Sequence, residues 1–151
     1  MADYTKLPGS PAKPRNGNTA RGSIAINNTS SFDLGQPVTT NSIGEILFAQ
    51  ANAANTANVL GLIIGPGEGS GNPIEYQYNG PLTLTTEQWD NVTGGSGGLT
   101  AGDVYWLSPA TAGKITTTKP ISGGNYQAPI GYATSPTTMM ILLGVAAGPF
   151  S

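Results

Sequence analysis

Short runs of alternating or continuous apolar residues, separated by glycine, proline, threonine and asparagine, recur along the whole chain. Residues 74–78 alternate apolar and polar positions, whereas residues 59–64 and 139–143 are almost wholly apolar. Alternation over a few residues is typical of half-buried β-strands, and short continuous apolar runs are typical of strands buried on both faces. No long stretch places apolar residues at helical spacing. The pattern predicts an all-β protein, a small, jelly-roll-like β-sandwich or barrel.

The strands are expected where these runs lie, with turn-forming residues at their ends. Residues 85–90 interrupt them with the pattern of a short helical turn, capped at its start, which seats Trp89. Residues 52–58 are expected to form a polar loop, because asparagine favours turns. The expected strands cover residues 23–27, 38–43, 45–51, 59–64, 74–78, 81–84, 104–107, 115–118, 128–133 and 139–143.

Two parts of the chain share a local pattern. Residues 44–50 and 102–108 both run from glycine through an acid and a β-branched residue to a large apolar residue and an aromatic one. Further along, Gly61 and Gly131 each interrupt an apolar run. We interpret this as a duplicated β-unit, since two copies are too few for a solenoid. The repeat suggests that the domain has a structural role, because nothing in the repeated pattern indicates catalytic chemistry.

Two strands have apolar residues on both faces, residues 104–107 and 139–143. In a small two-sheet protein each strand should turn one face to water, so something must cover the other face. The cover is either a loop of the same chain or a neighbouring subunit. For the second alternative, we expect a subunit interface that contains Tyr105, Leu107, Met140 and Leu142.

The composition excludes most catalytic chemistry. The 151 residues include no histidine and no cysteine, so the commonest general base, the commonest metal ligand and the thiol nucleophile are missing. Glu87 and Asp90 lie three positions apart on the expected helical turn, where a solvated face is a better interpretation than a glycosidase pair. We therefore expect no enzyme activity, no metal and no cofactor.

Two further patterns invite a binding interpretation. Residues 65–71 are as glycine-rich as a phosphate-binding loop, but a proline and a strand follow them in place of the helix and lysine that such loops need. Tyr76, Tyr78, Trp89 and Trp106 could stack against sugar rings, although packing in a core or an interface is the more frequent role of such residues.

The first 22 residues differ from the rest of the chain. Pro8, Pro11 and Pro14 favour an extended backbone, and four cations stand against one acid, whereas the remaining residues carry two lysines and seven acids. The sequence therefore divides into an extended basic arm, residues 1–22, and a β-domain, residues 23–151. Four scattered cations are a weak case for nucleic-acid binding, so we expect the arm to dock on an acidic protein surface.

The arm offers both charged and apolar contacts. Its expected contact residues are Tyr4, Lys6, Leu7, Lys13, Arg15 and Arg21. The start of the chain has no apolar core of the signal-peptide type, and no run approaches the roughly 20 apolar residues that span a membrane. We therefore expect the protein to be made in a cytoplasm, without a membrane partner.

One segment resembles a known class of proteins. Residues 82–90 with Trp89, residues 98–108 with the Gly-Asp-Val-Tyr-Trp-Leu-Ser stretch, and residues 129–133 resemble a recurring segment of tailed-bacteriophage structural proteins. The likeness covers about residues 80–143 and is greatest to small head decoration (cement) proteins and head-fibre proteins. It implies a β-sandwich or barrel that trimerises on the capsid shell and locks neighbouring capsomers together. No catalytic residue carries over, and the arm lies outside the likeness.

These features together lead to one expected function and one alternative. The first is a capsid decoration protein, made in the bacterial host, which sits on the outer surface of the virion, forms a homotrimer and contacts the major capsid protein. The alternative is a head- or tail-fibre module that contacts host polysaccharide through Tyr76, Tyr78 or Trp89.

Overall fold

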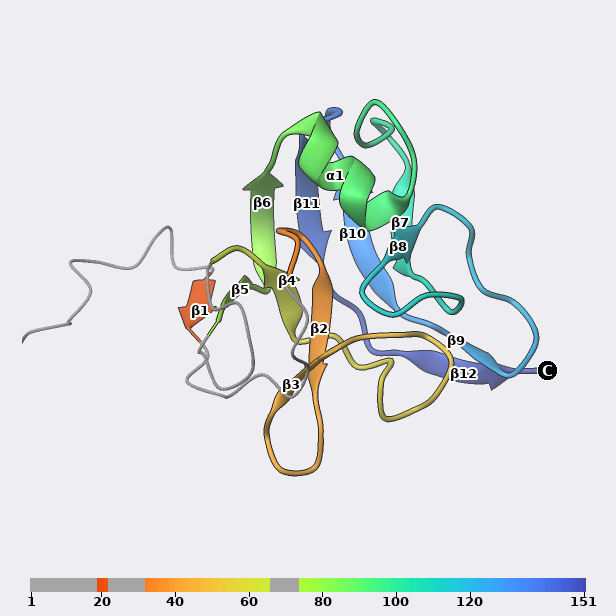
Figure 1. The fold of residues 1–151 in the computed structure, drawn as a ribbon. Coiled ribbons are helices and arrows are strands. Elements are labelled where there is room, and N and C mark those ends of the chain that lie inside the picture. The colour runs from red at the N-terminus through yellow and green to blue at the C-terminus, as the bar shows by residue number, and fades with distance from the viewer. Residues whose placement is uncertain (1–18, 22–31, 66–73) are drawn as a thin grey trace, which may run out of the picture.

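The computed structural model describes residues 19–21, 32–65 and 74–151 of the chain (Figure 1). These residues form short strands and a single short helix, so the fold is all-β, as the pattern predicted. The strands are β1 Thr19–Arg21, β2 Pro37–Thr40, β3 Ile46–Phe48, β4 Gly61–Ile63, β5 Glu75–Gln77, β6 Asn79–Thr83, β7 Val104–Leu107, β8 Ile115–Thr116, β9 Asn125–Gln127, β10 Pro129–Ala133, β11 Thr138–Leu142 and β12 Ala147–Phe150, and the helix is α1 Thr86–Thr93.

The strands make two five-stranded sheets and one two-stranded ribbon, and every pair is antiparallel. The first sheet has the order β1-β5-β4-β2-β3, and the second has the order β6-β11-β10-β7-β8. The ribbon pairs β12 with β9. The chain passes from the first sheet to the second between β5 and β6, so one residue, Tyr78, joins the two sheets.

The main core lies between one face of the second sheet and the elements that cover it. Leu62 of the first sheet, Trp89 and Val92 of α1, and Met139 and Ile141 of the second sheet are buried in one cluster. Figure 1 shows α1 lying across the strands of the second sheet. The inner face of the second sheet is therefore covered by its own chain.

The first sheet has apolar residues on both faces, as predicted for residues 59–64. Leu62 points into the main core, whereas its neighbour Ile63 belongs to a second cluster with Val38, Ile46 and Ile74. Phe32 and Phe48 pack against this second cluster, with their rings edge to face at a centroid distance of 5.4 Å. A strand between two clusters has no polar face, which explains its continuous apolar run.

Capping residues determine where helix α1 starts and ends. The Thr85 side chain accepts a hydrogen bond from Gln88 N at 3.1 Å, and the Gln88 side chain accepts one from Thr85 N at 2.9 Å. This capping box satisfies backbone donors at the helix start. Gly94, with φ of 78°, ends the helix in the left-handed conformation that favours glycine. The predicted turn is confirmed and extends three residues further, to Thr93.

The repeated pattern is only partly reproduced in space. Gly44 and Gly102 both have positive φ, 85° and 91°, and each precedes a strand, β3 or β7. However, β7 pairs directly with β10, whereas β2 lies between β3 and β4. The two halves share a local turn and strand but differ in strand pairing.

Some expected strands lie elsewhere or differ in length. The expected strand at residues 23–27 and the glycine-rich residues 66–71 fall outside the described residues. The ribbon strand β12 was not expected, because Ala147–Phe150 holds a glycine and a proline and has no strand pattern. Within the segment assigned to the arm, β1 pairs with β5 at the edge of the first sheet.

Candidate interaction face

Strand register sorts the residues of the second sheet onto two faces. Tyr132 lies between Met140 on β11 and Val104 on β7, and Met140 lies beside Pro81 on β6. These four residues form one continuous row across four neighbouring strands. We define the outer face by the apolar side chains on this side of the sheet: Pro81, Val104, Trp106, Tyr132, Met140 and Leu142.

The outer face leaves large apolar side chains in contact with solvent. Leu142 is 57% exposed, Val104 46% and Tyr132 39%, which makes three of the seven exposed large hydrophobic residues in the described part of the chain. Met140 and Trp106 are half-buried. Single exposed apolar residues are common on proteins, but a contiguous group of them marks an interaction surface.

The strands of the second sheet carry no charged residue. The ammonium of Lys119 lies 5.3 Å from the centre of the Trp106 ring, in a cation–π arrangement that holds a positive charge beside the outer face. Thr83 and Thr138 share a hydrogen bond of 2.8 Å at another corner. The strands of the outer face are therefore uncharged and mainly apolar, and the Lys119 ammonium lies over one of its border residues, Trp106.

The edge of the second sheet at β6 is closed by a side chain. Gln77, only 4% exposed, donates through Nε2 to the carbonyl oxygens of Asn79 and Pro81 at 3.0 and 2.9 Å. Pro81 also has no N–H group to offer a further strand. Both features disfavour the addition of another strand at this edge.

The structure divides the four predicted interface residues between the two faces. Met140 and Leu142 lie on the outer face, whereas Tyr105 and Leu107 are 3% and 0% exposed in the core of their own chain. Tyr105 and Leu107 were therefore wrong as interface residues, and the outward residues of β7 are Val104 and Trp106. A uniformly apolar strand does not reveal which residues face outward, because its alternation is lost.

Most of the predicted arm contacts fall in the first 18 residues. Tyr4, Lys6, Leu7, Lys13 and Arg15 lie outside the described residues. Arg21, the last of the set, ends β1.

The residues considered for chemistry are not brought together. Trp89 is fully buried, and its Nε1 donates to the Thr137 carbonyl at 2.8 Å, so it was wrong as a sugar platform. Tyr76 packs against the second cluster, and Tyr78 is 41% exposed. The Asp90 carboxylate accepts hydrogen bonds from Gly97 N and Gly98 N at 3.1 and 2.8 Å, which gives it a structural role in the loop after α1.

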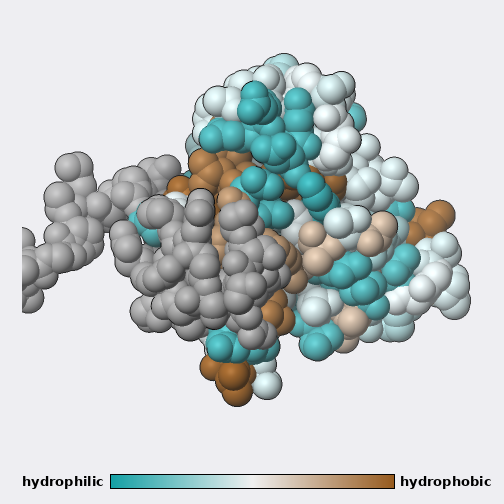
Figure 2. All heavy atoms as spheres, viewed as in Figure 1, coloured by the Kyte–Doolittle hydropathy of each residue, from teal (hydrophilic) through white to brown (hydrophobic). Residues whose placement is uncertain are grey.

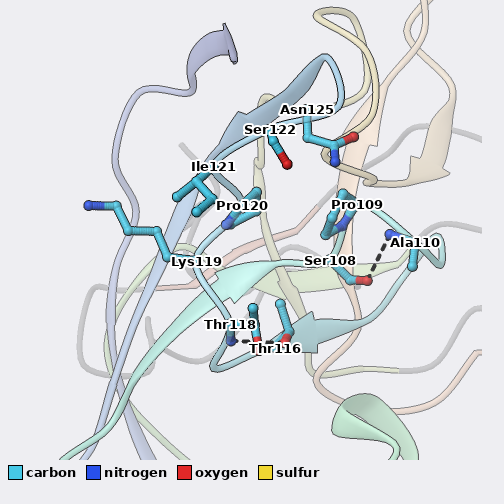
Figure 3. Close-up of a pocket in the computed structure, with 10 residues that line it drawn as sticks. All are labelled: Ser108, Pro109, Ala110, Thr116, Thr118, Lys119, Pro120, Ile121, Ser122 and Asn125. Carbon is cyan, nitrogen blue, oxygen red and sulfur yellow. Dashed lines mark hydrogen bonds between the residues drawn. The ribbon is translucent and has the colours of Figure 1, made fainter. Parts of the chain in front are cut away.

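A shallow pocket of about 350 Å³ lies beyond the ends of β7 and β8 (Figure 3). Ser108 Oγ accepts from Ala110 N at 3.2 Å, and Thr116 Oγ1 accepts from Thr118 N at 3.0 Å, so both hydroxyls support turns. The Lys119 ammonium points away from the pocket. The lining contains hydroxyl groups, prolines, one amide and Ile121, without a carboxylate or a nucleophile–base pair: Ser108, Pro109, Ala110, Thr116, Thr118, Lys119, Pro120, Ile121, Ser122 and Asn125.

Within the described ranges, no three acidic, histidine or cysteine side chains gather where they could hold a metal ion. No helix in that same part of the chain is long and apolar enough to span a membrane. No protein-family model and no curated protein matches the chain. The outer face is therefore the feature of the described structure that most strongly indicates an interaction.

Proposed function

We propose that the chain is a structural protein of a bacteriophage virion, a capsid decoration (cement) protein that binds the outer capsid shell and stabilises the junctions between capsomers. The observation that carries the proposal is the mainly apolar outer face, whose strands carry no charged residue, on a domain built from short strands. Such a face serves association with other protein surfaces. The proposed partners are the major capsid protein and further copies of this chain in a homotrimer, on the outer surface of the virion.

The resemblance to decoration and head-fibre proteins supports this proposal. Its residues lie in α1 and the second sheet, where Trp89 is the largest fully buried side chain and Gly131 lies against the neighbouring strand. A large buried side chain determines how the core packs, and a glycine at such a position determines how closely two strands approach each other. The likeness therefore concerns the same part of the domain that presents the outer face.

Charge suggests how the chain would hold the shell. The arm is basic, with four cations against one acid, and the rest of the chain is acidic. Each exposed ion pair contributes only about 0–1 kcal/mol, so a stable attachment needs several contacts of the arm and repetition over the copies in one assembly. This requirement favours an assembly of subunits over a single bound chain.

The second candidate function is a head- or tail-fibre module that contacts host polysaccharide. The pocket of about 350 Å³ favours it, because its hydroxyls and the Asn125 amide are groups that bind sugar hydroxyls. Tyr78 remains exposed as one aromatic contact, but Trp89 is removed from this candidate by its burial.

The experiment is to mix the purified full chain with capsid shells that lack it and to image the complexes by cryo-electron microscopy. The decoration proposal expects saturable binding, with density over capsomer junctions. Density at projecting tips, together with binding to host polysaccharide on a glycan array, would favour the fibre module. Failure to co-sediment with the shells would contradict the decoration proposal.

A further inference from the structure

We infer that two neighbouring pockets beside β8 form one groove that binds a neutral oligosaccharide. The first is the pocket of about 350 Å³ shown in Figure 3, and the second, of about 230 Å³, lies between β8 and the loop that follows α1. Thr116 lines both pockets, so they meet at this strand. The inference goes beyond the decoration proposal, and neither depends on the other.

The second pocket is lined mainly by residues that carry a hydroxyl group. Figure 2 shows teal and pale spheres over α1 and the loop after it, at the top of the view, so the surroundings of this pocket are polar or neutral. Its lining consists of Thr93, Gly95, Ser96, Gly98, Thr100, Tyr105, Ile115, Thr116 and Thr117.

Ser108 supplies a hydrogen-bond donor to the first pocket. This residue is only 7% exposed, and its Oγ accepts hydrogen bonds from Ala110 N and Thr111 N, both at 3.2 Å. A hydroxyl oxygen has two lone pairs, so these two bonds leave the Ser108 O–H hydrogen as the remaining group that can bind. No acceptor takes up this hydrogen among the residues that the structure describes. A ligand oxygen in the pocket would satisfy it.

Tyr105 has the same role in the second pocket. It is 3% exposed, and its Oη accepts a hydrogen bond from Thr100 N at 2.8 Å. The Tyr105 O–H hydrogen likewise has no acceptor within the described ranges of the chain. Buried polar groups are normally hydrogen-bonded, so the two hydroxyls provide one fixed donor in each pocket for the oxygens of a ligand.

Charge selects a neutral ligand. No carboxylate belongs to the described lining of either pocket, so the groove does not suit a cation. An anion is also disfavoured, because the Lys119 ammonium points away from the first pocket (Figure 3). In the second pocket, Gly98 N already donates to the Asp90 carboxylate at 2.8 Å, so this backbone donor is used and an acid lies nearby. The ligand is therefore best bound through hydroxyl groups, which both donate and accept.

The apolar groups of the groove suit a sugar as well. Pro109, Pro120 and Ile121 give the first pocket apolar surfaces beside its hydroxyls, and a sugar ring combines C–H faces with hydroxyl edges in the same way. Thr117 lines the second pocket and Thr118 the first, so hydroxyl groups continue from one to the other. Ligand pockets usually measure about 300–1,000 Å³, so the two together fit an oligosaccharide of a few units.

The test is nuclear magnetic resonance of the isotope-labelled full chain, titrated with neutral trisaccharides of glucose, galactose, mannose, rhamnose and N-acetylglucosamine. Trigalacturonic acid is the charged counterpart. Concentrations up to about 10 mM cover dissociation constants in the millimolar range. We expect at least one neutral trisaccharide to give saturable amide shifts that map to Thr100, Ser108 and Thr117. The corresponding monosaccharide should bind at least tenfold more weakly, because it fills only one pocket.

Two substitutions test the hydroxyl groups. Tyr105→Phe removes the buried donor of the second pocket and should weaken binding at least tenfold. Thr117→Val removes an exposed hydroxyl from the same pocket and should weaken binding several-fold. Thr40→Val is the matched control, because Thr40 ends β2 in the first sheet and lines neither pocket, and its binding should equal that of the wild type. Circular dichroism checks the fold, and if Tyr105→Phe does not fold, Thr117→Val decides the test.

Three results would overturn the inference: no neutral trisaccharide shifts the groove, trigalacturonic acid binds as tightly as the best neutral one, or the folded variants bind like the wild type. Shell binding is measured separately on the same samples. A chain that binds shells but no trisaccharide leaves the decoration proposal standing and refutes the groove. A chain that binds a trisaccharide through the groove but never binds shells supports the groove and refutes the decoration proposal.

Discussion

Two glycines of paired strands, Gly61 at the start of β4 and Gly131 within β10, leave no room for a side chain. A Cβ at Gly131 would overlap the carbonyl oxygen of Met140 on the neighbouring strand β11. A Cβ at Gly61 would lie 2.7 Å from the carbonyl oxygen of Gln77 on β5. Real Cβ atoms do not approach backbone atoms so closely, so alanine at either position must push two paired strands apart.

The expected cost follows from this geometry. Overpacking a well-packed site forces side chains and backbone to shift, which costs typically about 1–3 kcal/mol and occasionally more. We expect Gly131→Ala to lower the free energy of unfolding by about 3 kcal/mol or more, and Gly61→Ala by about 2 kcal/mol. At about 2–4 °C per kcal/mol for a chain of this size, the melting temperature of Gly131→Ala falls by roughly 6–12 °C.

Gly102→Ala is the matched control. Gly102 has φ of 91° but nothing within 4 Å of an added Cβ, so alanine there brings conformational strain without a clash. That strain costs about 1–2 kcal/mol. Urea unfolding monitored by circular dichroism gives the three free energies, and an equal or smaller loss for Gly131→Ala than for Gly102→Ala would refute the steric explanation.

Three further substitutions or deletions test other elements. Thr85→Ala removes the cap that accepts from Gln88 N, so thermal melting should show a loss of about 1 kcal/mol, whereas Thr85→Ser should retain most of the stability. Trp89→Phe removes the 2.8 Å hydrogen bond to the Thr137 carbonyl, which keeps its bond from Leu84 N at 2.9 Å, and it opens a void in the core. Urea unfolding should report a loss of roughly 2–4 kcal/mol, and a loss below about 1 kcal/mol would contradict the assigned role. Deleting residues 2–18 keeps β1 and should leave the melting temperature nearly unchanged while it weakens co-sedimentation with capsid shells; undiminished binding would remove the arm from the proposed function.

The class of the fold and its local elements were predictable from the sequence alone. Short apolar runs between turn-forming residues indicated an all-β chain, and the described residues confirm it. The helix was predictable because Thr85, Gln88 and Trp89 lie within a few residues of one another, and capping acts over that range. The absence of histidine and cysteine similarly limits the chemistry that this chain could perform in any fold.

Strand order and the orientation of the strands were decided by tertiary structure. The similar patterns before β3 and β7 suggested a repeat, yet β2 separates β3 from β4 while β7 pairs directly with β10. Pairing between strands distant in the chain depends on which faces can be buried together, and a local pattern does not contain that information.

The candidate interface shows the same limit at the level of single residues. Every residue of β7 and most of β11 are apolar, so the sequence could show that one face needed a cover but not which residues lie on it. The register with β10, together with the cover that α1 and the first sheet give to the inner face, buries Tyr105 and Leu107 and leaves Val104 and Leu142 exposed. Composition therefore indicated that the strands were suited to association, and the packing of distant elements determined which side chains remain available for it.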